Sequence, residues 1–249
     1  MKKIHKTTNA KQQSVMCSIT RCEIFMRGPM AGSPCQGILA VQNRKPLARR
    51  QVPEPWRGQI GSPLLFVSSN PSIDPNDDSP EVSMRDKSLE EYFETGFPDI
   101  FPKIRFRRRK PRVVRFWASI RQRAAEIWGL RPEHIRPGQH FSITEIVHCK
   151  SKKEHGVKKA LKTCKQLHWD NILKASGAKV IVVLGKTAHD AFSLDLPSPV
   201  RRLKGDFRNQ WVFTLPHPNA RGVKKSVFTF YGNRELAPIR DTLRKCRLR

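Results

Sequence analysis

Short runs rich in apolar residues occur at four places along this chain. They occupy residues 63–67, 141–148, 179–184 and 211–215, and polar or turn residues bound each of them. A short apolar run with such boundaries is typical of a strand that is buried on both faces of a parallel sheet. The pattern therefore predicts four core strands.

Apolar residues at helical spacing predict helices between these strands. The helices predicted in this way are 87–95, 113–129, 156–175, 186–192 and 235–246. Strands that alternate with helices indicate an α/β fold. We expect a three-layer α/β/α sandwich around a central, mostly parallel four-stranded sheet.

The segments outside this alternation lack clear periodicity. We expect residues 1–15 to be a disordered basic arm and residues 16–249 to form a single domain. Within that domain, 16–60 is rich in Cys, Pro, Gly and Arg and is interpreted as an irregular segment that wraps the fold. Residues 103–123 are interpreted as a basic insertion, and their first half, 103–112, as a loop.

The charge balance narrows the choice of partners. Lys and Arg number 48 against 21 Asp and Glu, for a formal net charge of +27. This excess predicts a polyanionic partner, with nucleic acid first and an anionic membrane surface second. No apolar run approaches the about 20 residues of a membrane span.

The first 15 residues also bear on localisation. They lack the apolar region of a secretory signal, although their lack of acids is compatible with an organellar transit peptide. We expect an intracellular, cytoplasmic, nucleoid-associated protein that acts on DNA as a monomer.

The basic stretch 103–123 adds to the argument for nucleic acid. It holds ten Lys or Arg, interleaved with Phe106, Phe116 and Trp117. Such a mixture suits phosphate contact together with stacking on unpaired bases. The alternative is a solvated charged face. The densest group, which we expect to bind DNA, is Arg107, Arg108, Arg109 and Lys110.

Two polar loops follow predicted strands. The first is Ser68-Ser69-Asn70-Pro71-Ser72, and the second is Pro216-His217-Pro218-Asn219-Ala220. Ligands of open α/β sheets bind at the carboxyl ends of strands, so both loops stand where chemistry is expected. The alternative is a pair of ordinary turns, because Ser, Asn and Pro are common turn residues.

These loops resemble the two motifs of the uracil-DNA glycosylase superfamily. The segments 144–149 and 180–188 lie between them in the order found in that superfamily. The closest resemblance is to the bacterial iron-sulfur type, and it covers about 35–245. It implies a DNA glycosylase that removes uracil or another damaged base in base excision repair.

The resemblance assigns roles to the loop residues. Asn70 stands at the position that handles the attacking water, with Ser68 and Ser69 beside the base. An amide cannot act as a general base, so Asn70 would position the water. His217 would stabilise the negative charge that develops on the leaving base, as an oxyanion hole does.

Other positions are implied for contacts with the flipped nucleotide. Phe93 and Phe97 are candidates to stack on the base. The alternative is that both are core residues of the helix 87–97. The loop from Asn219 onward would enter the DNA groove or displace the base, with Arg221 as its leading side chain.

Glu145 departs from the pattern of the uracil enzymes, which place an Asn there to read the base. An ionised carboxylate only accepts hydrogen bonds, so it would accept from N3–H of uracil but repel O4. A modified or purine base would fit better. The alternative is an ion pair between Glu145 and a neighbouring Lys or Arg.

The cysteines suggest a metal centre. Cys149 and Cys164 resemble the third and fourth ligands of the iron-sulfur uracil-DNA glycosylases, which take two more from a segment before the first motif. Four thiolates suit a [4Fe–4S] cluster, or Zn as the alternative. We expect Cys22, Cys35, Cys149 and Cys164, with Cys17 in reserve and Cys246 free. The cluster would pin segment 16–60 to the sheet.

Two other functions compete with the glycosylase. One is a protein of the same fold that binds abasic or damaged DNA without turnover, because the first motif lacks a carboxylate. The other is a metal-dependent hydrolase that uses His148, Glu145 and His217. It ranks last because these residues lack the spacing of a metal-ligand set.

Overall fold

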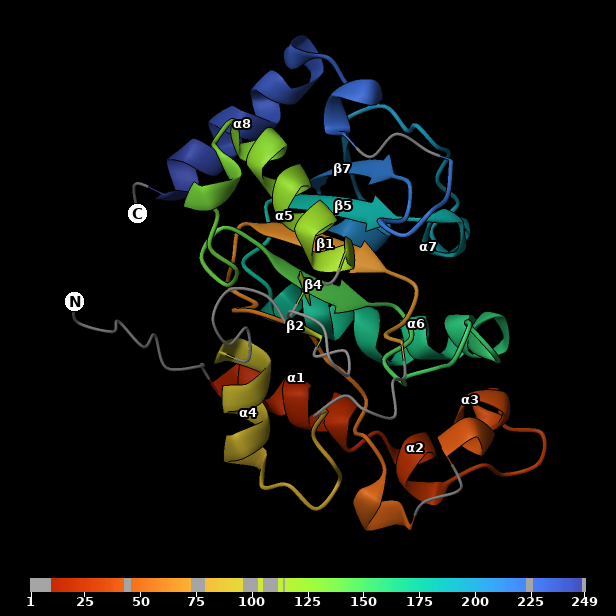
Figure 1. Cartoon of the computed structure of the whole chain (residues 1–249). Coiled ribbons are helices and arrows are strands. Elements are labelled where there is room, and N and C mark those ends of the chain that lie inside the picture. Colours follow the sequence, from red (N-terminus) through yellow and green to blue (C-terminus); the bar gives the residue numbers. More distant parts are fainter. Residues whose placement is uncertain are drawn as a thin grey trace.

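A five-stranded sheet forms the centre of the molecule (Figure 1). The computed structural model describes residues 10–42, 46–72, 79–95, 103–104, 112–113, 115–222 and 226–247. The strand order is β4-β1-β5-β7-β6. The strands are β1 (Leu64–Ser68), β4 (Ser142–Glu145), β5 (Val180–Leu184), β6 (Arg201–Leu203) and β7 (Gln210–Leu215). The four predicted strands are present and run parallel, so the α/β prediction is confirmed.

The fifth strand, β6, was not predicted. It pairs antiparallel with β7 at the edge of the sheet, where Arg201 and Arg202 are exposed. An edge strand needs few apolar residues, and charged side chains there also discourage pairing with other chains. A run of Arg-Arg-Leu therefore gives no strand signal in the sequence.

Alternate residues of each strand face opposite layers of helices. In β1, Leu65 and Val67 pack on one side, and Leu64 and Phe66 on the other. The second side is covered by α5 (Arg115–Trp128) and α8 (Asn233–Arg247). The first is covered by α1 (Ala10–Thr20), α4 (Asp86–Thr95), α6 (Val157–Ala175) and α7 (Lys186–Ala191). The three-layer sandwich is thus confirmed (Figure 1).

The N-terminal segment is more regular than expected. Helix α1 begins at Ala10, so the boundary drawn at residue 15 is wrong, and residues 1–9 lie outside the described part. Val15, Met16 and Ile19 of this helix are buried in the core. Two further helices follow, α2 (Glu23–Arg27) and α3 (Gln36–Gln42), which corrects the interpretation of 16–60 as irregular.

The basic stretch also contains regular structure. β2 (Lys103–Ile104) and β3 (Arg112–Val113) pair antiparallel where a loop was predicted. The predicted helix follows as α5, which begins at Arg115. Short 3-10 helices complete the described elements: η1 (Leu47–Arg49), η3 (Pro132–His134), η4 (Gly205–Phe207) and η5 (Val227–Thr229).

Across the described ranges, no helix combines the length and the apolar character that crossing a bilayer requires.

Candidate functional site

The two predicted loops meet the same edge of the sheet. β1 and β7 both pair with β5 and run parallel to it, so their carboxyl ends lie on either side of the end of β5. Neighbouring strands are about 4.8 Å apart, which places the ends of β1 and β7 about 10 Å from each other. Both loops are therefore close enough to contact one small ligand.

Asn70 is held by its own turn. Its Nδ2 donates to the carbonyl oxygen of Pro71 at 2.9 Å, and its Oδ1 lies 3.3 Å from Oγ of Ser69. The side chain is half-buried, whereas Ser68 and Ser69 are buried. The amide is thus fixed in orientation at the end of β1.

The Ser69 hydroxyl has a second partner, the carboxylate of Glu154. Oγ of Ser69 lies 3.0 Å from Oε1 of Glu154, in the loop between β4 and α6. No motif in the sequence points to this residue, because 85 positions separate it from Ser69. The site consequently has a carboxylate that the first motif lacks.

His217 is half-buried, and its local contacts define its tautomer. The backbone N–H of Asn219 lies 3.2 Å from Nδ1 of His217, so Nδ1 accepts and the neutral ring carries its proton on Nε2. Gly185 allows this placement. A Cβ on Gly185 would lie 2.9 Å from Cβ of His217, and the φ of +83° also favours glycine.

Helix α5 packs against the His217 loop. Arg123 is fully buried, and its Nη1 donates to the carbonyl oxygen of Pro216 at 2.7 Å. Burial lowers the pKa of Arg123 to about 10. Phe116, at the start of α5, places its ring 5.6 Å from the imidazole of His217. Sequence reasoning assigned Arg123 to a DNA-facing surface, and the structure corrects this.

Glu145 ends β4 directly beside Ser68 of β1. It is 8% exposed, and within the described chain its Oε2 has no hydrogen-bond partner. Burial raises the pKa of Glu145 well above its usual range, and the negative charges of Glu54 and Glu154 add to the rise. The protonated acid can donate as well as accept. The argument from the sequence that Glu145 would repel O4 of uracil assumed an ionised carboxylate, and it does not apply to the protonated acid.

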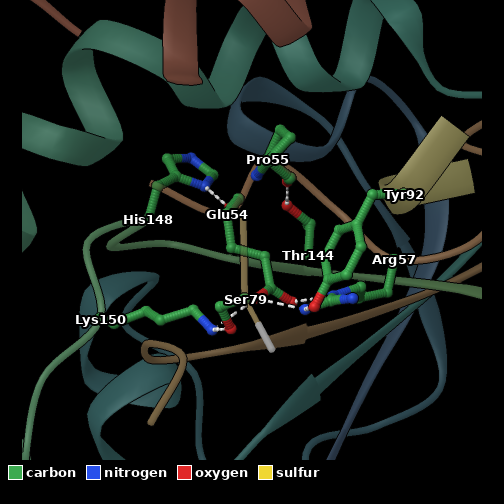
Figure 2. Close-up of polar contacts among 8 residues, drawn as sticks. All are labelled: Glu54, Pro55, Arg57, Ser79, Tyr92, Thr144, His148 and Lys150. Carbon is green, nitrogen blue, oxygen red and sulfur yellow. Dashed lines mark hydrogen bonds and ion pairs between the residues drawn. The ribbon is translucent and has the colours of Figure 1, made fainter. Parts of the chain in front are cut away.

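A buried ionic network holds the loop after β4 in place (Figure 2). Arg57 Nε lies 2.6 Å from Oε1 of Glu54, and Lys150 Nζ lies 3.6 Å from Oε2 of Glu54. Lys150 also bonds Ser79, and Arg57 donates to the hydroxyl of Tyr92 at 3.0 Å. The two cations lower the pKa of Glu54 despite its burial.

The structure changes the assignment of the stacking residues. Phe93 is 1% exposed and packs in the core between α4 and the sheet, so it is not a surface on which a base can stack. Phe97 lies outside the described residues. Phe116, beside His217, is the half-buried aromatic that the structure brings to the site.

The expected DNA-contacting residues are only partly described. Asn219 and Arg221 are exposed in the loop that follows His217. The group Arg107, Arg108, Arg109 and Lys110 lies outside the described part.

Four cysteines pack together with residues of α2 and α3. Cys35, Cys149 and Cys164 are buried in one apolar cluster with Phe25 and Ile38, and Cys22 packs against it. Burial raises the pKa of the Cys35 thiol to about 11, and the neighbouring Cys22 adds to the rise. Burial likewise raises the pKa of Cys164 to about 12.

Cys17, the reserve ligand, has other neighbours. Burial raises its pKa, and the charges that act on it are those of Arg21 and of Asp86 and Glu90 on α4. It therefore lies apart from the other four. Across the described ranges, however, no three or more His, Cys, Asp or Glu side chains are arranged to hold a metal ion. The four thiols match a tetrathiolate site in kind and number, but not in arrangement.

His148 is committed to the structure around it. Its Nδ1 bonds the carbonyl oxygen of Glu54 at 2.8 Å, and its ring lies 5.3 Å from that of His168. Burial lowers its pKa to about 3, and His168 adds to the effect. Among the described residues, His148, Glu145 and His217 are not arranged as a group that could hold a metal ion.

A comparison with protein families identifies the chain's class. The model of the uracil DNA glycosylase superfamily matches residues 55–234, which span both loops and every strand of the sheet. The chain therefore belongs to the uracil DNA glycosylase superfamily, whose members are generally DNA glycosylases. No curated protein matches the chain.

Proposed function

We propose that this protein is a DNA glycosylase of base excision repair, which hydrolyses the N-glycosidic bond of a damaged base flipped out of DNA. The observation that carries this proposal is that Asn70 and His217 follow the carboxyl ends of β1 and β7, the two strands that flank β5. A flipped nucleotide between the two loops would have its sugar near one and its base near the other.

His217 would act on the leaving base. When the glycosidic bond breaks, its electron pair stays on the base, and the sugar is left with positive charge. Because Nδ1 of His217 accepts from Asn219, the neutral ring carries its proton on Nε2, and we propose that this N–H donates to a base oxygen. A donor placed where negative charge develops stabilises the transition state.

Asn70 would hold the attacking water. Water oxygen bonds to the sugar carbon, one water proton leaves to solvent, and the departing base takes a proton in return. An amide contributes geometry and no proton transfer, so its effect is to orient the water.

Glu145 would read the base edge. As a neutral acid, Glu145 can donate to a base carbonyl and accept from a base N–H at the same time. Uracil presents that pair, so we propose uracil as the first substrate to test, with other deaminated bases after it. Ser68 and Ser69 would line the same side.

We further propose that Cys22, Cys35, Cys149 and Cys164 close around a [4Fe–4S] cluster when it binds, with zinc as the alternative. The shared apolar cluster of these cysteines supports this, although their arrangement in the structure is not that of a metal site. This assignment would place the protein with the iron-sulfur type of the superfamily. When bound, the group would supply structure rather than redox chemistry, by joining α2 and α3 to the loop after β4 and to α6.

Base release from oligonucleotides tests the proposed activity. We expect wild-type protein to release at least one of uracil, hypoxanthine and xanthine, and His217→Ala to lower the rate about 10²–10³-fold. His134→Ala is the matched control, because His134 is exposed on η3 away from the two loops.

Two outcomes would contradict the proposal. Binding of damaged DNA with no release of any base would favour the non-catalytic alternative. Equal rates in the His217→Ala and His134→Ala variants would remove His217 from the chemistry.

A further inference from the structure

Glu154 brings a carboxylate to the end of β1 from a distant part of the chain. Its Oε1 lies 3.0 Å from Oγ of Ser69, in the turn that holds Asn70. Its Oε2 lies 3.5 Å from Oγ1 of Thr187, at the start of α7. Because α7 follows β5, Glu154 spans the ends of two neighbouring strands.

The same contacts connect Glu154 to both halves of the site. On one side, Ser69 Oγ is shared between Glu154 and Oδ1 of Asn70. On the other, Thr187 lies two residues after Gly185, the residue on which His217 packs. The carboxylate therefore contacts the loop that would hold the water and the start of α7, close to the residue on which His217 packs.

The backbone around Glu154 is held in an uncommon conformation. Lys153 and Glu154 have φ values of 53° and 57°, in the left-handed region that non-glycine residues seldom occupy. Ser151 Oγ bonds the carbonyl oxygen of His155 at 2.7 Å across this turn. Gly156 ends it against α3, where a Cβ would lie 2.7 Å from N of Ile38.

Residues held in such regions persist when the surrounding structure fixes them, and they concentrate at functional sites. In this loop the conformation directs the Glu154 side chain to Ser69. The two acids near the end of β1 also differ in environment, because Glu145 is buried and Glu154 is exposed. Such a difference separates the roles of two carboxyl groups.

We propose that the Glu154 carboxylate is the catalytic anion of this site, which faces the sugar of the flipped nucleotide and stabilises its positive charge in the transition state. Ser69 is the positioning residue that holds it. This inference rests on the proposed glycosylase function and supplies the negative charge that the first motif lacks. Glycosidic cleavage through an oxocarbenium-like state is elsewhere assisted by carboxylates in this way.

Binding of two abasic-site analogues tests the charge directly and does not require the base to be known. One oligonucleotide carries a pyrrolidine, which is cationic at neutral pH, and the other carries a neutral tetrahydrofuran. We expect wild-type protein to bind the cationic analogue about tenfold or more tightly. Glu154→Gln should lose most of this preference, with unchanged affinity for the neutral analogue.

Glu133→Gln is the matched control. Glu133 is exposed on η3 and pairs with Arg131 at 3.4 Å, so its loss should leave the preference unchanged. Ser69→Ala should reduce the preference partly, because the carboxylate loses its hydrogen bond. Circular dichroism melts of all variants identify any that fail to fold.

The outcomes separate this inference from the proposed function. If wild-type protein releases a base and Glu154→Gln retains both the release rate and the wild-type preference, the role of Glu154 is wrong and the glycosylase stands. If wild-type protein neither releases a base nor prefers the cationic analogue, both fail. Support requires loss of preference and a release rate about 10²-fold lower in Glu154→Gln.

Discussion

The carboxyl group of Glu145 is buried at the end of β4, where nearby acids disfavour its charge. Its pKa is raised by burial first, and then by the charges of Glu54 and Glu154. Glu54 is buried to a similar extent but stays charged, because Arg57 and Lys150 pair with it. Two glutamates in one region therefore have opposite protonation preferences, and partner cations decide which acid ionises.

Removal of one partner from the Glu54 network should be costly. Arg57→Met leaves the buried Glu54 carboxylate without its closest cation, which lies 2.6 Å away. We expect the free energy of unfolding to fall by about 3–5 kcal/mol. Urea unfolding at neutral pH measures the change. Arg131→Met is the control, since that side chain is 75% exposed and its ion pair should matter little.

The pH dependence of this cost has a definite sign. The folded-state pKa of Glu54 is lowered, so its contribution to stability is present above the unfolded-state pKa and is lost as the pH falls through the folded-state pKa. The stability difference between wild type and Arg57→Met should therefore shrink toward acid pH. A difference that is constant down to pH 3 would contradict the assignment.

At the scale of elements, the sequence was most informative about the parallel core. Strands such as β5 are buried on both faces, which requires a continuous apolar run that is visible without a structure. Helix α5 was likewise visible from its apolar spacing. The short helices α2 and α3 were not, because their stability comes from packing on distant segments rather than from local propensity.

The site was partly predictable for the same reason. Asn70 and His217 follow strands, and parallel topology brings strand ends to one edge. Glu154 contacts Ser69 across 85 positions, through a loop whose left-handed residues carry no turn signal such as Gly or Asn. The burial of Phe93 depends on how α4 docks, which the helical pattern alone does not specify.

The cysteine cluster is an element-scale prediction, because it would join α2 and α3 to the loop after β4. We expect anaerobically purified protein to be brown, with about four iron and four sulfide per chain. Cys149→Ser should lose the colour and the iron. Cys246→Ser is the control, since Cys246 lies on α8, outside the apolar cluster of the other four.

Thermal stability alone would not decide the question, because a serine in a buried thiol position costs about 1–3 kcal/mol without any metal. Metal content is the deciding measurement. Colourless protein with one zinc per chain would select the alternative metal. Protein without stoichiometric metal, prepared anaerobically, would leave the cysteines as core residues.

At the scale of the whole molecule, the net charge of +27 favours binding to the polyanionic backbone of DNA. We do not expect every basic residue of 103–123 to contribute equally to DNA binding. Arg123 is buried under the His217 loop, and Arg121 Nε donates to the carbonyl oxygen of Pro132 at 2.6 Å. We therefore expect the phosphate contacts to come from other basic residues of 103–123 and from loops near the strand ends, such as that of Arg221.

The salt dependence of the DNA-binding constant reports the number of phosphate contacts. If about five basic side chains contact phosphates, the logarithm of the binding constant should fall with the logarithm of salt concentration at a slope of about −4. Replacing Arg108 and Arg109 together by Gln should make the slope shallower by about 2. Replacing Arg201 and Arg202 by Gln is the matched control, because β6 pairs with Val212 to Gln210, at the end of β7 away from His217. Equal slopes in the two double variants would move the phosphate contacts out of the basic stretch, while the chemistry proposed for Asn70, Glu154 and His217 would be unaffected.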